Sequence, residues 1–265
     1  MTVTNWNREP PPGFQGLRED LPMTVYCRHL PHWRQDGATY FVTFRLADSL
    51  PQSKLRELEA IKREWAMNGE SRRTDWQSVL QQTDCRSVPH RKTDCQSVLR
   101  NCESVLPRHV PRENWENFTR SLMVKVEGWL DEAMGECWMA RPEIARMVMD
   151  SLHHFDNDQY ELGCYVVMAN HVHGIFRPLQ PKTLPLDKIL QSRKRRTSRE
   201  INASVGRSGT LWEEESFDRI IRDEEHLYRC IQYIGRNPAK ARLPSDQWHR
   251  WIRPSWELLG WKFED

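Results

Sequence analysis

Three stretches of the chain have the residue pattern of β-strands. Residues 160–168 are rich in β-branched and aromatic side chains, and 171–176 form a second segment of this kind. Ala169 and Asn170 lie between the two, which predicts a tight hairpin. An earlier strand is predicted at 39–46, where the period of two places four apolar side chains on one face: Tyr40, Val42, Phe44 and Leu46.

Apolar residues three and four positions apart predict helices in the intervening segments. Pro142 suits the first turn of one helix, a second is expected over 186–201, and Asn237-Pro238 is expected to end the last helix, 224–236. The other apolar helix faces consist of Leu55, Leu58, Ile61 and Trp65; Trp115, Phe118, Leu122, Val126, Trp129 and Ala133; Ile144, Val148, Leu152 and Phe155; and Leu227, Cys230, Ile231 and Ile234. This arrangement predicts an α+β fold, with one antiparallel sheet and helices packed mainly on one of its faces.

Residues 71–112 differ in composition from the rest of the chain. They contain no Gly, Ala, Ile, Met, Phe or Tyr, and they repeat a motif such as Thr-Asp-Cys-Gln-Ser-Val about every ten residues. Repeats this short and polar cannot stack into a core. We therefore interpret the segment as a low-complexity insertion, translated from a repetitive DNA element. The alternative, a metal site at Cys85, Cys95 and Cys102, matches no standard ligand spacing.

The insertion interrupts one predicted domain, which spans residues 23–245. Residues 1–22 are rich in Pro and polar groups and predict an irregular N-terminal arm, and 246–265 form a Trp-rich tail. Deletion of 71–112 is expected to leave a folded, active protein, and a loss of solubility on deletion would contradict this interpretation.

The sequence argues against an integral membrane protein and against a secreted protein. No run in the 265 residues approaches the ~18 apolar residues that a membrane span needs, and the N-terminus lacks the apolar region of a secretion signal. Seven irregularly spaced Cys argue against a disulfide framework and favour the reducing cytoplasm. The net charge is only +2, so a surface that binds polyanions would have to come from local clustering.

His171 and His173 are the first candidates for chemistry. Because they are two residues apart in a predicted strand, both imidazoles project from the same face. Two neutral imidazoles can ligate a divalent metal, which also needs a third group. The chain has ten His, so the alternative is a chance pair of surface or packed histidines.

Tyr233 and Asn237 are the second candidates. They are four residues apart and therefore one turn apart on the predicted last helix, at the edge of its apolar face. A Tyr in such a place can pack its ring and direct its hydroxyl at a neighbouring site. The alternative is a tyrosine at the edge of the core and an asparagine that ends the helix before proline.

A basic stretch and an aromatic tail are the third and fourth candidates. Residues 188–199 contain no acidic residue, and this favours contact with phosphate backbones. The alternative is a solvated helix face. Six of these twelve residues are cationic: Lys188, Arg193, Lys194, Arg195, Arg196 and Arg199. In the tail, four Trp interleave with Arg250 and Arg253, either to stack on unpaired bases or, as we favour for most of them, to pin the tail to the domain.

Taken together, four segments in this order resemble the REP-associated tyrosine transposases, which are single-tyrosine relatives of the HUH transposases. The resemblance covers about residues 25–68 and 113–245. The segments are Tyr40-Phe-Val-Thr-Phe-Arg-Leu-Ala-Asp-Ser-Leu-Pro51, Val166-Val-Met-Ala-Asn-His-Val-His173, Leu211-Trp-Glu-Glu-Glu-Ser-Phe-Asp-Arg-Ile-Ile-Arg222 and Tyr233-Ile-Gly-Arg-Asn-Pro-Ala-Lys-Ala-Arg-Leu243.

The resemblance implies a ferredoxin-like (RRM-like) antiparallel sheet with the His pair, the HUH motif, on a central strand. His171, His173 and Asn237 would hold Mg²⁺ or Mn²⁺, Tyr233 would be the nucleophile, and Asn170 would hold the hairpin turn and orient the His pair. The implied DNA contacts are the six cationic residues of 188–199 together with Arg236.

The implied activity is the metal-dependent cleavage and strand transfer of single-stranded DNA at palindromic hairpin repeats, through a 5′-phosphotyrosine intermediate. The resemblance favours a monomer, with a dimer as the alternative. It also implies a protein of the cytoplasm that is associated with the nucleoid. Two other functions stay open: a non-catalytic protein that binds hairpins, and a hydrolase whose His pair activates water.

This chain departs from the family pattern at three positions. Ala169 stands where the family often has Pro, and Glu213 where Gln is common. Arg242 stands where relatives usually have Gly, which suits a backbone with positive φ, so an arginine there would cost free energy if that backbone geometry is kept.

Overall fold

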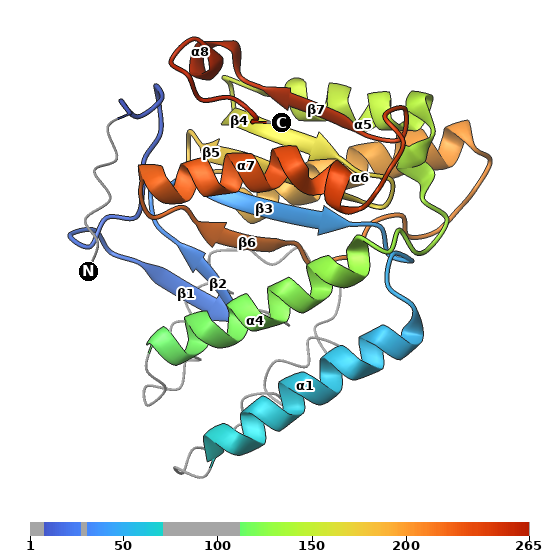
Figure 1. The fold of residues 1–265 in the computed structure, drawn as a ribbon, viewed down its shortest axis with the longest axis horizontal. Helices are drawn as coiled ribbons and strands as arrows, with labels where there is room; N and C mark the ends of the chain where they lie inside the picture. The colour runs from blue at the N-terminus through green and yellow to red at the C-terminus, as the bar shows by residue number, and fades with distance from the viewer. Residues whose placement is uncertain (1–7, 28–30, 71–111, 265) are drawn as a thin grey trace.

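The computed structural model describes residues 8–27, 31–70 and 112–264 (Figure 1). The repeat segment, with Cys85, Cys95 and Cys102, lies outside the described residues except for Arg112, the first residue of a helix. Within the described part, no helix is both long enough and apolar enough to cross a bilayer.

The protein is an α+β fold built on a five-stranded antiparallel sheet in the order β6-β3-β5-β4-β7, beside a separate two-stranded hairpin, β1-β2. The strands are β1 Thr24–Cys27, β2 Pro31–Arg34, β3 Tyr40–Arg45, β4 Tyr160–Val167, β5 His171–Pro178, β6 Phe217–Ile220 and β7 His249–Ile252. The helices are α1 Gln52–Glu70, α4 Arg112–Leu130, η2 Trp138–Ala140, α5 Pro142–His153, α6 Leu186–Ser204, α7 Glu224–Lys240 and α8 Pro254–Glu257.

The predicted hairpin at Ala169-Asn170 is confirmed and lies at the middle of the sheet. β4 and β5 pair from Tyr160↔Pro178 to Val167↔Val172, and a β-bulge lies between Leu162 and Cys164. The bulge changes the face to which the following residues point, because it adds one residue to the alternation along β4.

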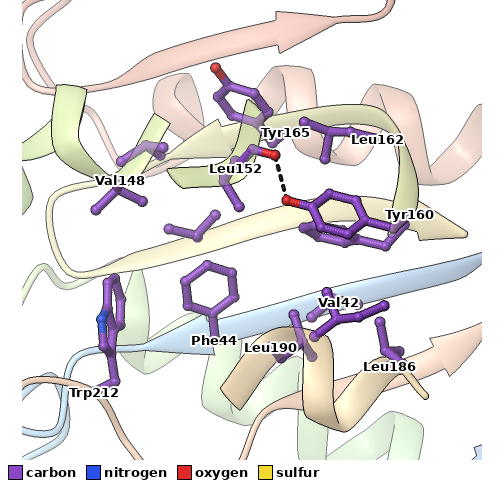
Figure 2. Packing of buried hydrophobic residues seen from close by; sticks show 14 of the residues in the cluster. Val42, Phe44, Val148, Leu152, Tyr160, Leu162, Tyr165, Leu186, Leu190 and Trp212 are labelled. Carbon is purple, nitrogen blue, oxygen red and sulfur yellow. Dashed lines mark hydrogen bonds between the residues drawn. The ribbon is translucent and has the colours of Figure 1, made fainter. Parts of the chain in front are cut away.

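One face of the sheet is covered by α5 and α6 and contains the larger apolar core. Tyr40, Val42, Phe44 and Leu46 all point to this face, as the period of two predicts. Figure 2 shows Val42 and Phe44 of the sheet among Val148 and Leu152 of α5 and Leu186 and Leu190 of α6. Pro142 begins α5 as predicted.

The opposite face of the sheet is covered by α7 (Figure 1), which corrects the prediction that helices pack mainly on one face. Phe41, Val166 and Ile175 alternate with the residues of the first core and pack against α7. The middle strands are therefore apolar on both faces, so both must be covered.

The helix α7 continues past Asn237-Pro238 to Lys240, so the prediction that this pair ends the helix is wrong. A proline inside a helix removes the hydrogen bond from its own nitrogen to the carbonyl four residues earlier. Here only the last turn follows Pro238, and that turn keeps a bond from the Ala241 nitrogen to the Asn237 carbonyl.

Strands also lie in segments where the sequence pattern predicted none, whereas the described part of the arm, 8–22, has no helix or strand, as expected. The segment set apart as a tail supplies β7, which pairs with β4, and Trp256 and Trp261 are buried. At the other end the β1-β2 hairpin precedes the first predicted strand, and its His32 pairs with Asp218 of β6. Helices α1 and α4 pack together through the apolar residues Leu55, Leu58, Val126 and Trp129.

Candidate metal and nucleophile site

His171 and His173 lie on β5, the middle strand of the five, and both point to the face covered by α7. Both side chains are fully buried, and their Nε2 atoms are 3.0 Å apart. His173 is also stacked on Phe41 of β3, at 5.5 Å between ring centroids. The alternation predicted from sequence therefore places the two imidazoles side by side under the helix.

Hydrogen bonds to the outer ring nitrogens hold both imidazoles in place. Asn170 donates through Nδ2 to the carbonyls of Leu130 and Met134, so its Oδ1 accepts from His171 Nδ1, at 2.8 Å. This assigns the proton to His171 Nδ1 and leaves a lone pair on its Nε2. Thr43 Oγ1 lies 2.8 Å from His173 Nδ1, and a hydroxyl can donate or accept there.

Burial keeps both imidazoles uncharged. Removal from water lowers the pKa of His171 to about 3, and it holds the pKa of His173 well below its ordinary value. Neutral imidazole is the form that ligates metals. The pair is therefore in the right protonation state across the physiological pH range.

The helix α7 brings Tyr233 and Asn237 over the same pair. Asn237 is buried, and its Nδ2 lies 3.3 Å from His173 Nε2. The ring of Tyr233 meets that of His173 edge-on, with 5.3 Å between the centroids. Four residues from two separated parts of the chain thus converge at one point, as the one-turn spacing on α7 allows.

Two buried oxygens at this point make no well-formed hydrogen bond within the described part of the chain: Tyr233 Oη, which has Glu127 beside it, and Asn237 Oδ1. Such atoms are rare in folded proteins and call for an explanation, of which an absent ion is one. The unpartnered Asn237 oxygen lies on the residue that the resemblance implies as third metal ligand.

The spacing of the two imidazole nitrogens fits a six-coordinate divalent cation. Two cis ligands of an octahedral Mg²⁺, each about 2.1 Å from the ion, are about 3.0 Å apart. The two Nε2 atoms have this separation, which also suits an N–H···N bond between the rings. Among the described residues no three His, Cys, Asp or Glu form a metal-binding group, so the third ligand here would be the Asn237 amide oxygen.

The surroundings of Tyr233 include two carboxylates of α4 that the sequence analysis missed. Burial, and next the charge of Glu127, raise the pKa of Tyr233 well above its ordinary value. Four residues after Glu127, Asp131 Oδ2 pairs with Lys240 Nζ at 2.6 Å, and this pair joins α4 to the end of α7. The i, i+4 spacing of Glu127 and Asp131 on a predicted helix was the available signal.

Most of the basic stretch lies away from this site, because α6 covers the opposite face of the sheet. Arg193 is buried over the ring of Phe155, and Lys194 donates to the carbonyls of Glu213 and Glu214. These two cations therefore contact other groups inside the fold and do not face a phosphate backbone. Four other cations of α6 are exposed or half-buried on that side: Lys188, Arg195, Arg196 and Arg199.

Arg236 is exposed on α7 and lines a hollow with Tyr233, Asn237 and Lys240, so among the seven predicted DNA contacts it is one that the structure brings beside the site. Arg242 follows the end of α7 and has a φ of +53°. The positive-φ geometry that suits glycine is thus kept here with an arginine.

No family model matches this chain, and no curated protein matches it. One solved structure, described as a REP-associated tyrosine transposase bound to a REP hairpin, aligns over 77% of this chain and 68% of its own. The identity over the alignment is 13% and the TM-score is 0.32. A TM-score of this size does not establish a common fold.

Proposed function

We propose that this protein is a metal-dependent enzyme that cleaves single-stranded DNA and transfers the cut strand, through a covalent bond to Tyr233. The observation that carries the proposal is the convergence of Tyr233 with His171, His173 and Asn237, whose buried, neutral and partly unpartnered groups suit a cation and a nucleophile. The four motifs that resemble REP-associated tyrosine transposases include all of these residues.

The sheet topology supports the proposed ferredoxin-like core. Helix α5 lies between β3 and β4 in the chain, and α6 lies between β5 and β6, so these elements follow the β-α-β-β-α-β order of that fold. The corresponding strands are arranged β6-β3-β5-β4, that is, fourth, first, third and second. In this arrangement α7 follows the fourth strand of the ferredoxin-like order, and it brings Tyr233 to the face of the sheet that α5 and α6 leave uncovered.

His171, His173 and Asn237 would hold the ion, which is Mg²⁺ or Mn²⁺ in this proposal. When bound, it would polarise the scissile phosphate and favour the ionised form of the nearby phenol. Asn170 and Thr43 orient the two imidazoles through their outer nitrogens, as the partners of metal-binding histidines commonly do.

In the proposed reaction Tyr233 Oη forms a bond to phosphorus while the bond from phosphorus to the 3′ oxygen breaks. The 3′ oxygen leaves with its electron pair and takes up a proton from water to become a 3′-hydroxyl, and the 5′ side stays on the enzyme as a phosphotyrosine. The phenol proton must go to a base, and Glu127 is the carboxylate that lies beside the Tyr233 hydroxyl. Reversal of these steps joins the strand to a new 3′-hydroxyl without ATP.

The proposed substrate is a palindromic DNA hairpin with an unpaired flank, as the motif resemblance implies. The test is incubation of the protein with a panel of labelled hairpins, with Mn²⁺ or with EDTA, followed by a denaturing gel. We expect a covalent protein–DNA band that depends on the metal, and we expect it to disappear in Tyr233→Phe and His173→Ala.

Tyr228→Phe is the matched control, because Tyr228 lies on the same helix and its hydroxyl donates to Glu264, away from the His pair. This variant should keep the covalent band. Cleavage that survives Tyr233→Phe without a covalent band would point to hydrolysis by activated water. Binding without any band, for every hairpin and metal, would leave a non-catalytic hairpin-binding protein.

A further inference from the structure

A cavity of about 540 Å³ opens beside Tyr233, at the edge of the sheet formed by β6. Its walls come from the β1-β2 region, α4, β6 and the first half of α7, so it is formed by segments that are far apart in the chain. Tyr233 and Glu127 lie in its wall. The cavity is therefore continuous with the proposed nucleophile.

Four arginines line this cavity: Arg120, Arg219, Arg222 and Arg229. Arg120, Arg222 and Arg229 are exposed. The ion pair of Arg229 with Glu225 is at the surface, with more than half of the arginine side chain exposed, and such pairs contribute little. The guanidinium of Arg219 stacks over Phe41, 4.9 Å from the ring centroid, beneath the site.

The acidic groups of the cavity wall are largely engaged elsewhere. Asp218 is paired with Arg34 and His32, and the Asp223 carboxylate accepts from the His226 nitrogen as the cap of α7. Glu127 is the remaining carboxylate among the described lining residues, and burial raises its pKa. The wall thus offers an excess of positive charge, which complements phosphates.

The same wall carries apolar and aromatic surface between the arginines. Phe217 and Trp33 line the cavity, and Val124 on α4 is 65% exposed although it is a large apolar residue. Aromatic rings beside cations are the combination that binds unpaired bases, since bases stack on rings and phosphates pair with guanidinium groups.

We infer that this cavity, which we call the β6–α7 groove, binds the unpaired DNA strand next to the scissile phosphate. The inference deepens the proposed function by naming the surface that holds the strand. It moves the main DNA contacts from the basic helix to arginines of α4, β6, α7 and the loop between β6 and α7. The size of the cavity lies in the range of about 300–1,000 Å³ that small organic ligands occupy, which suits a short run of nucleotides.

The test measures the binding of a fluorescent oligothymidylate of about ten nucleotides to the full chain, at low salt, by anisotropy. All variants carry Tyr233→Phe, so that no covalent reaction changes the readout. We expect Arg120→Glu combined with Arg222→Glu to weaken binding about 10-fold or more, because both positions would face phosphates. The matched control is Arg195→Glu with Arg199→Glu, which makes the same charge change on α6 and should weaken binding less than about 3-fold.

A second comparison tests stacking without any change of charge. Phe217→Leu keeps an apolar side chain but removes the ring, and we expect binding to weaken about 5-fold or more. Thermal unfolding of each variant checks that the fold is intact. The inference would be overturned if Tyr233→Phe alone failed to bind the oligonucleotide. It would also be overturned if the double substitution in the groove and the double substitution on α6 weakened binding equally.

A failure of this inference can be distinguished from a failure of the proposed function. A metal-dependent covalent band on hairpins, together with unchanged binding in the groove variants, would refute the groove and leave the enzyme. Loss of oligonucleotide binding in the groove variants, with no covalent band on any hairpin, would support the groove as a nucleic-acid surface and refute the enzyme.

Discussion

The two faces of the five-stranded sheet differ in how their tyrosine hydroxyls are bound. On the α5/α6 face the Tyr160 hydroxyl donates to the Leu152 carbonyl at 2.5 Å (Figure 2), and Tyr40 donates to the Gln35 carbonyl, although Ser151 Oγ and Arg193 Nε on that side have no partner among the residues described. On the α7 face, Tyr233 Oη makes no well-formed hydrogen bond among the residues described, and neither does Asn237 Oδ1. An unpartnered buried oxygen costs stability, and two of them beside the buried His pair are what a ligand site requires.

A buried histidine beside the edge strand β6 provides the prediction with the largest expected effect. His32 lies between Asp218 Oδ2, at 2.8 Å, and Glu215 Oε1, at 3.0 Å. Burial alone would lower the pKa of His32, but the two carboxylates outweigh it and raise the pKa to about 9.

Since the folded pKa of His32 lies above the unfolded value of about 6.5, its stabilising contribution is complete below that pH. It decreases as the pH rises toward 9 and is lost above it. The shift corresponds to about 3 kcal/mol. We expect His32→Gln to lower the free energy of unfolding at pH 6 by this order and to make no further difference above pH 9, as measured by urea titration.

His154→Gln is the control for this prediction, because it makes the same substitution at an exposed position. Parallel profiles for the wild type and His32→Gln across this range would show that His32 is not held in its charged form. The pairing of His32 with Asp218 and Glu215 would then not stabilise the fold.

A pair of tyrosine substitutions compares the faces directly. Tyr160→Phe removes a satisfied hydrogen bond and should lower the free energy of unfolding by about 1 kcal/mol. Tyr233→Phe removes a hydroxyl that makes no well-formed hydrogen bond, although Glu127 lies beside it, and should change the free energy of unfolding by less than Tyr160→Phe does. Urea unfolding of both variants under the same conditions measures the difference, and equal losses would contradict the comparison.

The smallest expected effect concerns the end of the helix that carries the site. Arg242→Gly should raise the free energy of unfolding by about 0.5–1 kcal/mol, because glycine adopts a φ of +53° without strain. The neighbouring Ala241 has an ordinary right-handed conformation, so Ala241→Gly should lower stability by a similar amount. Thermal unfolding measures both, and a decrease for Arg242→Gly would show that its side chain contributes more than its backbone costs.

Local patterns predicted a large part of the site. The β4-β5 hairpin, the shared face of His171 and His173, and the one-turn spacing of Tyr233 and Asn237 all depend on residues close together in sequence. For such residues the period of the strand or helix decides the direction of each side chain, whatever packs around it. The assignment of Tyr233 as nucleophile stays a prediction for the covalent assay.

Other features depended on partners that local pattern does not contain. The burial of Arg193 and Lys194 follows from the packing of α6 on the sheet, and the approach of Glu127 to Tyr233 follows from the packing of α4 beside α7. The tail residues became β7 because β4 had an unpaired edge, which a strand from any part of the chain could fill.

The sequence by itself determined which side chains share a strand or helix face, and with that the chemistry available at each face. Only the tertiary structure decided which faces meet: the His pair with α7, the arginines with the groove, and the basic helix with the far side of the sheet. The reason is that backbone geometry sets direction within a few residues, whereas contacts between distant segments depend on how all the apolar faces are buried together.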